Sequence, residues 1–219
     1  KGLGQLTKRR KIKYIRGKAG FTGKNSLEIE DADGNQQQLD FEKAIIATGA
    51  RAASLPDIEF DHDRIMNAKS ALELKDPPDK LLVVGAGYIG LEMSQIYNAL
   101  GSKITIVEAT SGILPGADRD LTDVIHKDKK ELLKDTRFNT KVKTVKKQRN
   151  KLKVTFENED DQQEEEFDKM LIAVGEVPNS ENLGLEDLGI ETDENNFIRV
   201  NEYRQTNIDH IYAIGDVAG

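Results

Sequence analysis

The sequence predicts an α/β protein with a parallel sheet in its centre and an antiparallel meander ahead of that sheet. Two observations predict the parallel sheet. From Lys80 an apolar, β-branched stretch, LLVV, runs into a glycine-rich loop and then into a segment with the apolar spacing of a helix. A second strand-like stretch, KITIVE, follows that helix. Strand, helix and strand in this order form the unit from which parallel sheets are built.

Composition and charge are those of a globular protein. The 219 residues include 39 acidic and 32 basic side chains, and the resulting net charge of −7 argues against nucleic-acid binding. No apolar run reaches the ~18–20 residues needed to cross a bilayer, and no signal peptide is visible, so we expect no membrane association and a cytoplasmic location. The sequence contains no cysteine, which excludes disulfides and thiolate metal sites within it.

The first 80 residues are predicted to form short strands and a linker. KIKYIRGKAGF, SLEIED and QQQLDF are rich in strand-forming residues and are separated by the turn signals TGKN and ADGN, so we expect the meander here. The basic cluster Lys8–Lys13 is expected on the solvent face of its edge strand. An apolar strand, AIIATG, follows. Residues 50–80 are then expected to be a crossing linker with a short helix near SALELK.

The second part of the chain supplies two predicted helices and several strands. GYIGLEMSQIYNALG is predicted to be a helix that stops at Gly101, with one apolar stripe made of Ile89, Met93, Ile96, Tyr97 and Leu100. ADRDLTDVIHKDKKELLKD is a second amphipathic helix. TKVKTV, KLKVTFEN and EEFDKMLIAVG are predicted strands that include a hairpin, and the acidic stretch Asn158–Glu166 is predicted to be a solvated loop. Residues 197–219 are expected to run strand, loop, strand.

A glycine-rich loop, Gly85-Ala86-Gly87-x-x-Gly90, lies between the first apolar strand and its helix. The first glycine permits a tight turn, the second lets the backbone approach a pyrophosphate, and the third lets helix and strand pack closely. The helix N-terminus offers unpaired N–H groups and a partial positive charge, so no side-chain cation is needed. The bare pattern is common by chance, but this context predicts a Rossmann-like dinucleotide-binding domain.

An acidic residue, Glu108, ends the next strand about 20 residues beyond the glycines, where such domains place the carboxylate that accepts bonds from the adenine ribose. A carboxylate at this point repels a 2′-phosphate, and the following residues, ATSG, include no arginine to receive one. We therefore predict a preference for NAD(H) over NADP(H). The competing interpretation is a glycine-rich turn followed by an ordinary exposed glutamate.

Stretches on both sides of this unit resemble the flavoprotein reductases that bind two dinucleotides. AIIATGA resembles the strand by which those chains leave the flavin domain, and IYAIGDVAG resembles the segment by which they return to it. Within that group the sequence is similar to the dihydrolipoyl dehydrogenase family over essentially all 219 residues. The stretches that carry this similarity occur in the same order as in that family, and they include GKAGFTGKNSLEIE, AVGEVPNSENLGLEDLGIE and FIRVN.

The resemblance implies two cofactors, NAD and FAD, and assigns residues to each. It implies an FAD-domain segment at residues 1–49, an NAD-binding domain at 50–176 and a return segment at 177–219. The positions that match FAD-contacting ones are Ala19, Thr48, Gly49 and Asp216. Those that match the nicotinamide pocket or the adenine site, beyond the loop and Glu108, are Tyr88, Ile89, Glu92, Val142, Ala173 and Gly175. Two positions depart from the pattern: Glu176 stands where the family has arginine, and Ser94 stands where it has glycine.

The activity implied by the resemblance is hydride transfer between NAD and FAD, coupled to dithiol–disulfide exchange with lipoamide. The partner would be the lipoyl domain of a 2-oxoacid dehydrogenase complex, and the parent protein would be a homodimer. The cysteine pair and the His–Glu pair of the family are not in this sequence, so we assign no catalytic residue and expect a central fragment, inactive alone. Two alternatives stay open: another FAD-dependent NADH oxidase or reductase, and a non-catalytic dinucleotide-binding module.

Overall fold

The computed structural model describes residues 2–73, 75–158 and 161–219. The chain forms two compact units. One consists of residues 52–176, and the other combines residues 1–51 with 177–219, so the chain leaves one unit, builds the second and returns. The short connecting strands β5 (Ala50–Ala52) and β14 (Glu176–Pro178) pair with each other. The domain boundaries expected from the sequence lie after residues 49 and 176.

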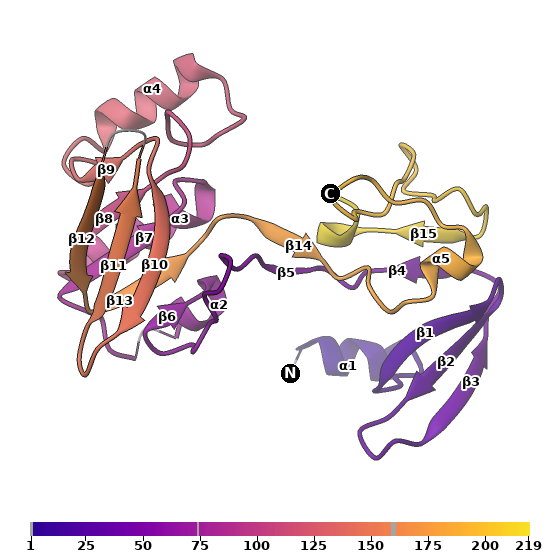
Figure 1. Cartoon of the computed structure of the whole chain (residues 1–219). Helices are drawn as coiled ribbons and strands as arrows, with labels where there is room; N and C mark the ends of the chain where they lie inside the picture. Colours follow the sequence, from indigo (N-terminus) through magenta and orange to yellow (C-terminus); the bar gives the residue numbers. More distant parts are fainter. Residues whose placement is uncertain (1, 74, 159–160) are drawn as a thin grey trace. The chain divides into compact units, whose positions relative to one another are not determined.

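The unit of residues 52–176 is built on a parallel five-stranded sheet, which confirms the predicted fold class (Figure 1). Its strands, in spatial order, are β6 (Ile65–Met66), β13 (Lys169–Ile172), β7 (Lys80–Val84), β8 (Lys103–Val107) and β9 (Thr136–Arg137). The strand β7 is central because its residues after Lys80 are leucines and valines, which suit burial on both faces.

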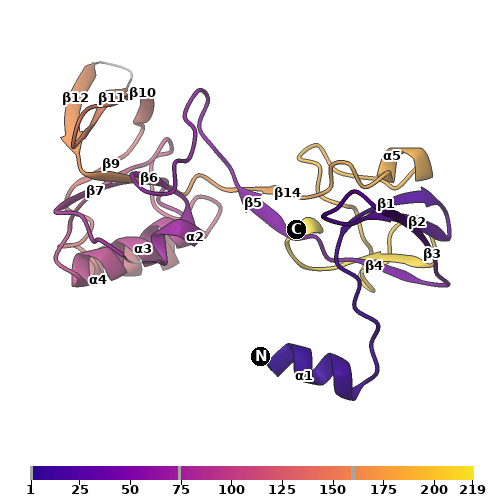
Figure 2. The same cartoon turned by 90° about the horizontal axis from the view of Figure 1, so that it is seen from below.

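Helices cover one face of this sheet and an antiparallel sheet covers the other (Figure 2). The helices that pack on this sheet are α2 (Ala68–Ala71) and α3 (Tyr88–Ala99), and the antiparallel strands are β10 (Lys141–Lys147), β11 (Leu152–Glu157) and β12 (Gln162–Phe167). A further helix, α4 (Arg119–Asp128), follows β8 in the chain. Side chains alternate along β7: Leu81 and Val83 pack with the helices, whereas Leu82 and Val84 pack against the antiparallel sheet. Each face therefore has its own core.

The other unit contains the predicted meander. The strands β1 (Lys18–Gly23), β2 (Ser26–Glu30) and β3 (Gln36–Asp40) pair antiparallel in sequence order. The strands β4 (Ala44–Ile46) and β15 (Ile211–Ala213) pair in parallel, and a single 3₁₀ turn, η1 (Gly215–Val217), follows β15. The short helix α5 (Leu185–Leu188) completes the core of this unit with Ile46, Ile198, Ile211 and Val217.

The amino-terminal stretch differs from the prediction. Residues 2–9 form the helix α1 (Gly2–Arg9), residues 12–17 belong to neither helix nor strand, and the first strand begins at Lys18. The alternation of Ile12 and Tyr14 with basic residues suggested an edge strand, but both side chains are exposed. A strand needs a hydrogen-bonding neighbour as well as a suitable pattern.

The acidic stretch Asn158–Glu166 was predicted to be a loop, and this is wrong for its second half. The strand β12 includes Gln162–Glu166 and pairs with β11, while residues 159 and 160 lie outside the described ranges. Opposite charges across the strands compensate the acidic side chains; Lys153 Nζ, for example, lies 2.6 Å from Glu164 Oε2. The predicted strand at Phe197 is also absent, since only an isolated bridge joins Thr192 and Ile198.

The predicted helices form, but the buried face of α3 differs in part from the predicted stripe. In α3, Met93 and Tyr97 are buried as predicted, whereas Ile96 and Leu100 are exposed and Leu91 takes part in the core instead. The helix stops at the predicted Gly101, whose φ is +98°. In α4 only Thr122 is buried. No helix in the described part of the chain is long and apolar enough to cross a membrane.

Candidate dinucleotide site

The glycine-rich loop joins β7 to α3 at the carboxyl edge of the parallel sheet. Gly85 has φ +105°, and a Cβ at this position would lie 2.3 Å from the carbonyl oxygen of Ala173. A Cβ on Gly90 would lie 2.0 Å from the carbonyl oxygen of Gly85. Both positions are therefore restricted to glycine by their close neighbours.

Gly87 meets a different requirement. It is the N-cap of α3, with no side-chain cap, and a Cβ built on it has nothing within 4 Å. The first intrahelical bond of α3 runs from Leu91 N–H to the Gly87 carbonyl, so the N–H groups of the first turn have no helical acceptor. Donors at a helix N-terminus, behind a glycine with open space in front of it, fit a pyrophosphate.

Glu108 follows β8 and lies against this loop. Its Oε2 accepts a hydrogen bond from Ala86 N–H at 2.8 Å, and its Oε1 accepts one from Thr110 N–H at 2.8 Å. The residue is only 7% exposed. Glu108 is therefore not an exposed glutamate, and its carboxylate directly contacts the glycine-rich loop.

The loop after β8 folds back over the glycines. Leu114 N–H donates to the Ala86 carbonyl at 2.9 Å, so Ala86 is bonded through both of its backbone groups. The guanidinium of Arg119, at the start of α4, donates to the carbonyls of Ile113 and Leu114 at 3.2 Å each. Sequence reasoning did not identify Thr110, Leu114 or Arg119, although the SGILPG stretch signals a turn-rich loop.

The end of β13 lies next to the glycine-rich loop, as expected for adjacent parallel strands. Ala173 N–H donates to the Val84 carbonyl at 2.8 Å, and its own carbonyl limits Gly85 to a residue without a side chain. Gly175 follows with φ +125° and is exposed. Ile89 is partly buried and packs against the core on the helix side.

The other residues matched by resemblance to the nicotinamide pocket or the adenine site, and the two positions that depart from the family pattern, lie on α3, β10 and β14. Tyr88 is 62% exposed, and Glu92 is exposed one turn further along α3. Val142 on β10 pairs with Phe156 and packs against the core of the antiparallel sheet. Ser94 is buried in α3, where its hydroxyl donates to the Gly90 carbonyl at 2.7 Å. The exposed Glu176 begins β14.

The residues assigned to FAD lie in the other unit. Thr48 follows β4, and Asp216 follows β15. Because those strands pair in parallel, both residues lie at the carboxyl edge of the pair. Thr48 Oγ1 donates to the Asn179 carbonyl at 2.7 Å, and the Gly49 carbonyl accepts from Asn179 N–H at 2.9 Å. Asp216 is exposed, as is Ala19 on β1.

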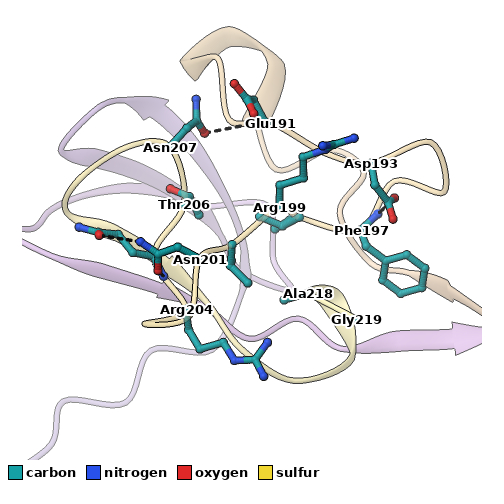
Figure 3. A pocket seen from close by; sticks show the side chains of 13 residues that line it. Glu191, Asp193, Phe197, Arg199, Asn201, Arg204, Thr206, Asn207, Ala218 and Gly219 are labelled. Atoms are coloured by element: carbon teal, nitrogen blue, oxygen red, sulfur yellow. Dashed lines mark hydrogen bonds between the residues drawn. The ribbon is translucent and has the colours of Figure 1, made fainter.

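A cavity of about 760 Å³ lies elsewhere in this second unit (Figure 3). Its polar side chains are largely bonded to neighbouring backbone: Asn207 Oδ1 accepts from Glu191 N–H at 3.1 Å, and Asp193 Oδ1 accepts from Phe197 N–H at 2.8 Å. None of the predicted cofactor residues lines it. The glycine loop with Glu108 is therefore the better candidate site.

Comparison with known proteins identifies a family for the whole chain. Residues 1–219 match the pyridine nucleotide-disulphide oxidoreductase family. The chain is 40% identical to a dihydrolipoyl dehydrogenase of Vibrio cholerae over its full length and 38% identical to one of Haemophilus influenzae. It covers 46% of the first enzyme and 45% of the second, so it spans about half the length of the curated relatives it matches.

Solved structures agree as well. LpdA of Mycobacterium tuberculosis matches 94% of this chain with a TM-score of 0.83 and 29% identity, over 45% of its own chain. The HOCl-induced flavoprotein disulfide reductase RclA of Escherichia coli matches 99% of this chain with a TM-score of 0.81 and 30% identity, over 49% of its own chain. With a family match over every residue, this chain belongs to the pyridine nucleotide-disulphide oxidoreductase family.

Proposed function

We propose that residues 52–176 bind NAD(H). The observation that carries this proposal is the contact between Glu108 and the glycine-rich loop, because it places a carboxylate beside the donors of the α3 N-terminus. Pyrophosphate would lie against the first turn of α3, in the open space at Gly87. The adenine ribose would lie against Glu108, and Ala173 and Gly175 would border the nicotinamide side.

The same carboxylate supports a preference for NAD(H) over NADP(H). A 2′-phosphate next to Glu108 would bring two anions together in a partly desolvated place, where repulsion is strong. The guanidinium of Arg119 donates to the backbone carbonyls of Ile113 and Leu114, so it is already engaged in the loop after β8. Discrimination here combines repulsion of the 2′-phosphate with hydrogen bonds from the free ribose hydroxyls of the favoured cofactor.

We further propose that the protein to which this chain corresponds is an FAD-dependent oxidoreductase of the dihydrolipoyl dehydrogenase type. The named relatives at 38–40% identity support this type. Bound NAD and FAD would supply the hydride chemistry, and this chain's part is to hold and orient the two dinucleotides. The carboxyl edge formed by β4 and β15, with Thr48 and Asp216, would contribute to the FAD site. By the same proposal the electron partner is lipoamide on a lipoyl domain, and the whole protein is a homodimer.

The similarity to RclA supports a second candidate, a flavoprotein disulfide reductase with another substrate. The two candidates share the NAD(H) site and differ in their disulfide substrate. Lipoamide-dependent NADH oxidation by the corresponding longer protein separates them, because a reductase of the second kind would not accept lipoamide at a comparable rate.

Titration of the purified chain with NADH, followed by nicotinamide fluorescence, tests the cofactor proposal. We expect saturable NADH binding, and NADPH binding at least about tenfold weaker, which corresponds to ~1.4 kcal/mol. Equal affinity for both nucleotides would contradict the role of Glu108. The absence of NADH binding would contradict the proposal as a whole.

A further inference from the structure

The carboxylate of Glu108 is bonded on both of its oxygens by the protein itself. Ala86, which donates to Oε2, belongs to the loop after β7, whereas Thr110, which donates to Oε1, belongs to the loop after β8. One side chain therefore connects the two loops that frame the candidate site. Both bonds are 2.8 Å long, as expected for N–H donors to a charged acceptor.

These bonds match the burial of the carboxylate. Glu108 is only 7% exposed as a residue, so its carboxylate needs hydrogen bonds to compensate for the water it has lost. Each of its oxygens has two acceptor positions, so one position on each oxygen remains for a ribose hydroxyl. The two backbone bonds and two ribose bonds can therefore exist together, and the backbone bonds orient the carboxylate in advance.

The main chain of Glu108 is held independently of its side chain. Glu108 N–H donates to the Arg137 carbonyl at 2.9 Å, and the Glu108 carbonyl accepts from Thr140 N–H at 3.0 Å. A change of side chain thus removes the connection between the loops without removing the residue from its place after β8. Mutation of Glu108 can therefore test the role of the carboxylate without disturbing the main-chain hydrogen bonds.

We propose that Glu108 is a positioning residue as well as a ribose ligand: its carboxylate holds the glycine-rich loop to the loop after β8, and nucleotides of either kind need that connection. The proposal rests on the proposed function, since it concerns the same NAD(H) site. Its consequence is that a single replacement of Glu108 weakens NADH binding and does not create NADPH binding.

The side-chain chemistry explains why close analogues fail. In Glu108→Gln the amide has one oxygen and one NH₂ group, so one of the two backbone N–H groups would face another donor. In Glu108→Asp the charge remains, but the shorter side chain cannot reach both Ala86 and Thr110. If Glu108 served only as a ribose ligand, Glu108→Gln would remove the repulsion of a 2′-phosphate and NADPH binding would improve.

The first test compares nucleotide affinities of wild type, Glu108→Gln and a matched control, Glu131→Gln, which changes an exposed glutamate in the same unit. We expect the dissociation constant for NADH to rise about ten- to hundredfold in Glu108→Gln and to stay unchanged in the control. NADPH should bind Glu108→Gln no more tightly than it binds wild type. Tighter NADPH binding by Glu108→Gln would overturn the proposal.

The second test needs no nucleotide. Amide hydrogen exchange measured by NMR should show Ala86 and Thr110 exchanging at least about tenfold faster in Glu108→Gln than in wild type. The amides of Leu82 and Ile106, in the sheet, serve as the reference for intact folding. Glu108→Asp is expected to lose protection at one of the two amides. Wild-type exchange rates at both amides in Glu108→Gln would refute the positioning role.

The two tests separate this inference from the proposed function. If wild type binds no NADH, the proposed function fails, but the exchange comparison still decides whether Glu108 holds the two loops together. If wild type binds NADH and both amides exchange equally in all variants, the NAD(H) site stands and the positioning role is wrong.

Discussion

Gly90 on α3 faces Gly85 so closely that a Cβ on Gly90 would lie 2.0 Å from the Gly85 carbonyl oxygen. The carbonyl belongs to the backbone of the tight turn after β7, and a turn with φ +105° at Gly85 has little freedom to move away. Helix and strand therefore approach to a distance that only a glycine at position 90 permits.

We expect Gly90→Ala and Gly87→Ala to differ in what they damage. Gly90→Ala should lower the free energy of unfolding by about 1–3 kcal/mol or more, because the added methyl group overpacks the turn. Gly87→Ala, with nothing within 4 Å of its Cβ, should cost less than about 1 kcal/mol and instead weaken NADH binding by obstructing the pyrophosphate. Urea unfolding and NADH titration measure the two effects. Equal stability losses, or full NADH affinity in Gly87→Ala, would contradict this interpretation.

A second prediction concerns Glu165, which joins the antiparallel sheet to the parallel one. Its carboxylate bonds Lys80 of β7 and lies 2.5 Å from Nη2 of Arg137 of β9. Lys80 and Arg137 also lie over the rings of Phe167 and Phe156, at 4.8 and 5.1 Å. Glu165→Ala should cost about 1–3 kcal/mol, because it removes the anion that two partly buried cations share and leaves Arg137, among the described residues, with only Asp135, at 3.5 Å.

The control is Glu166→Ala, at the neighbouring exposed position of β12, which should change stability by less than about 0.5 kcal/mol. Burial raises the pKa of Glu165, but the bonds with Lys80 and Arg137 outweigh it and lower that pKa. The stabilisation should therefore be full above the ordinary glutamate range and decrease as pH falls through the lowered pKa. If Glu165→Ala and Glu166→Ala unfold at the same urea concentration, the bonds of Glu165 with Lys80 and Arg137 do not stabilise the fold.

A third prediction concerns Asp61, which organises the turn before β6. Its carboxylate accepts from three successive backbone N–H groups, those of residues 63–65, and lies 2.8 Å from Lys147 Nζ. Burial raises the pKa of Asp61, but these bonds outweigh it and lower the pKa from 3.8 to about 2.

Because the folded-state pKa is lowered, Asp61 should stabilise the fold above pH ~4 and lose this effect as pH falls towards 2. Water screens this exposed turn, so we expect Asp61→Asn to cost only about 1 kcal/mol at neutral pH. Urea unfolding at pH 6 and pH 2.5 should show the difference from wild type shrinking at the lower pH. A difference that grows on acidification would mean that the charge is not what stabilises the turn.

A fourth prediction concerns the outer side of α4. Leu121 and Val124 are 62% and 65% exposed, whereas the polar Thr122 is buried beneath the same helix. Replacing either apolar residue with lysine should change the free energy of unfolding by less than about 0.5 kcal/mol and reduce self-association of the isolated chain. Light scattering over a concentration series checks the second effect. A large loss of stability in Leu121→Lys would show that this side chain is packed in solution.

Local patterns were sufficient for much of the parallel sheet and for the glycine loop. The strand LLVV, the three glycines and the helix that stops at Gly101 all follow from short-range sequence, since hydrophobic periodicity and turn glycines act within about 20 residues. These local patterns failed where strand formation depends on pairing with another strand. Gln162–Glu166 forms a strand because β11 offers it a hydrogen-bonding edge and a cation, whereas Ile12–Tyr14 does not, because no strand in the described ranges pairs with it.

The sequence by itself therefore determined the α/β class, the meander and the glycine-rich loop, with an acidic residue, Glu108, after the next strand. Only the tertiary structure decided that the acid is buried against Ala86 and Thr110 and that α4 presents Leu121 and Val124 to solvent. The reason is physical: spacing along a strand or helix sets which residues share a face, but which face is covered depends on neighbours distant in sequence. Glu108 became a bridge only when two loops, each following its own strand, met at one edge of the sheet.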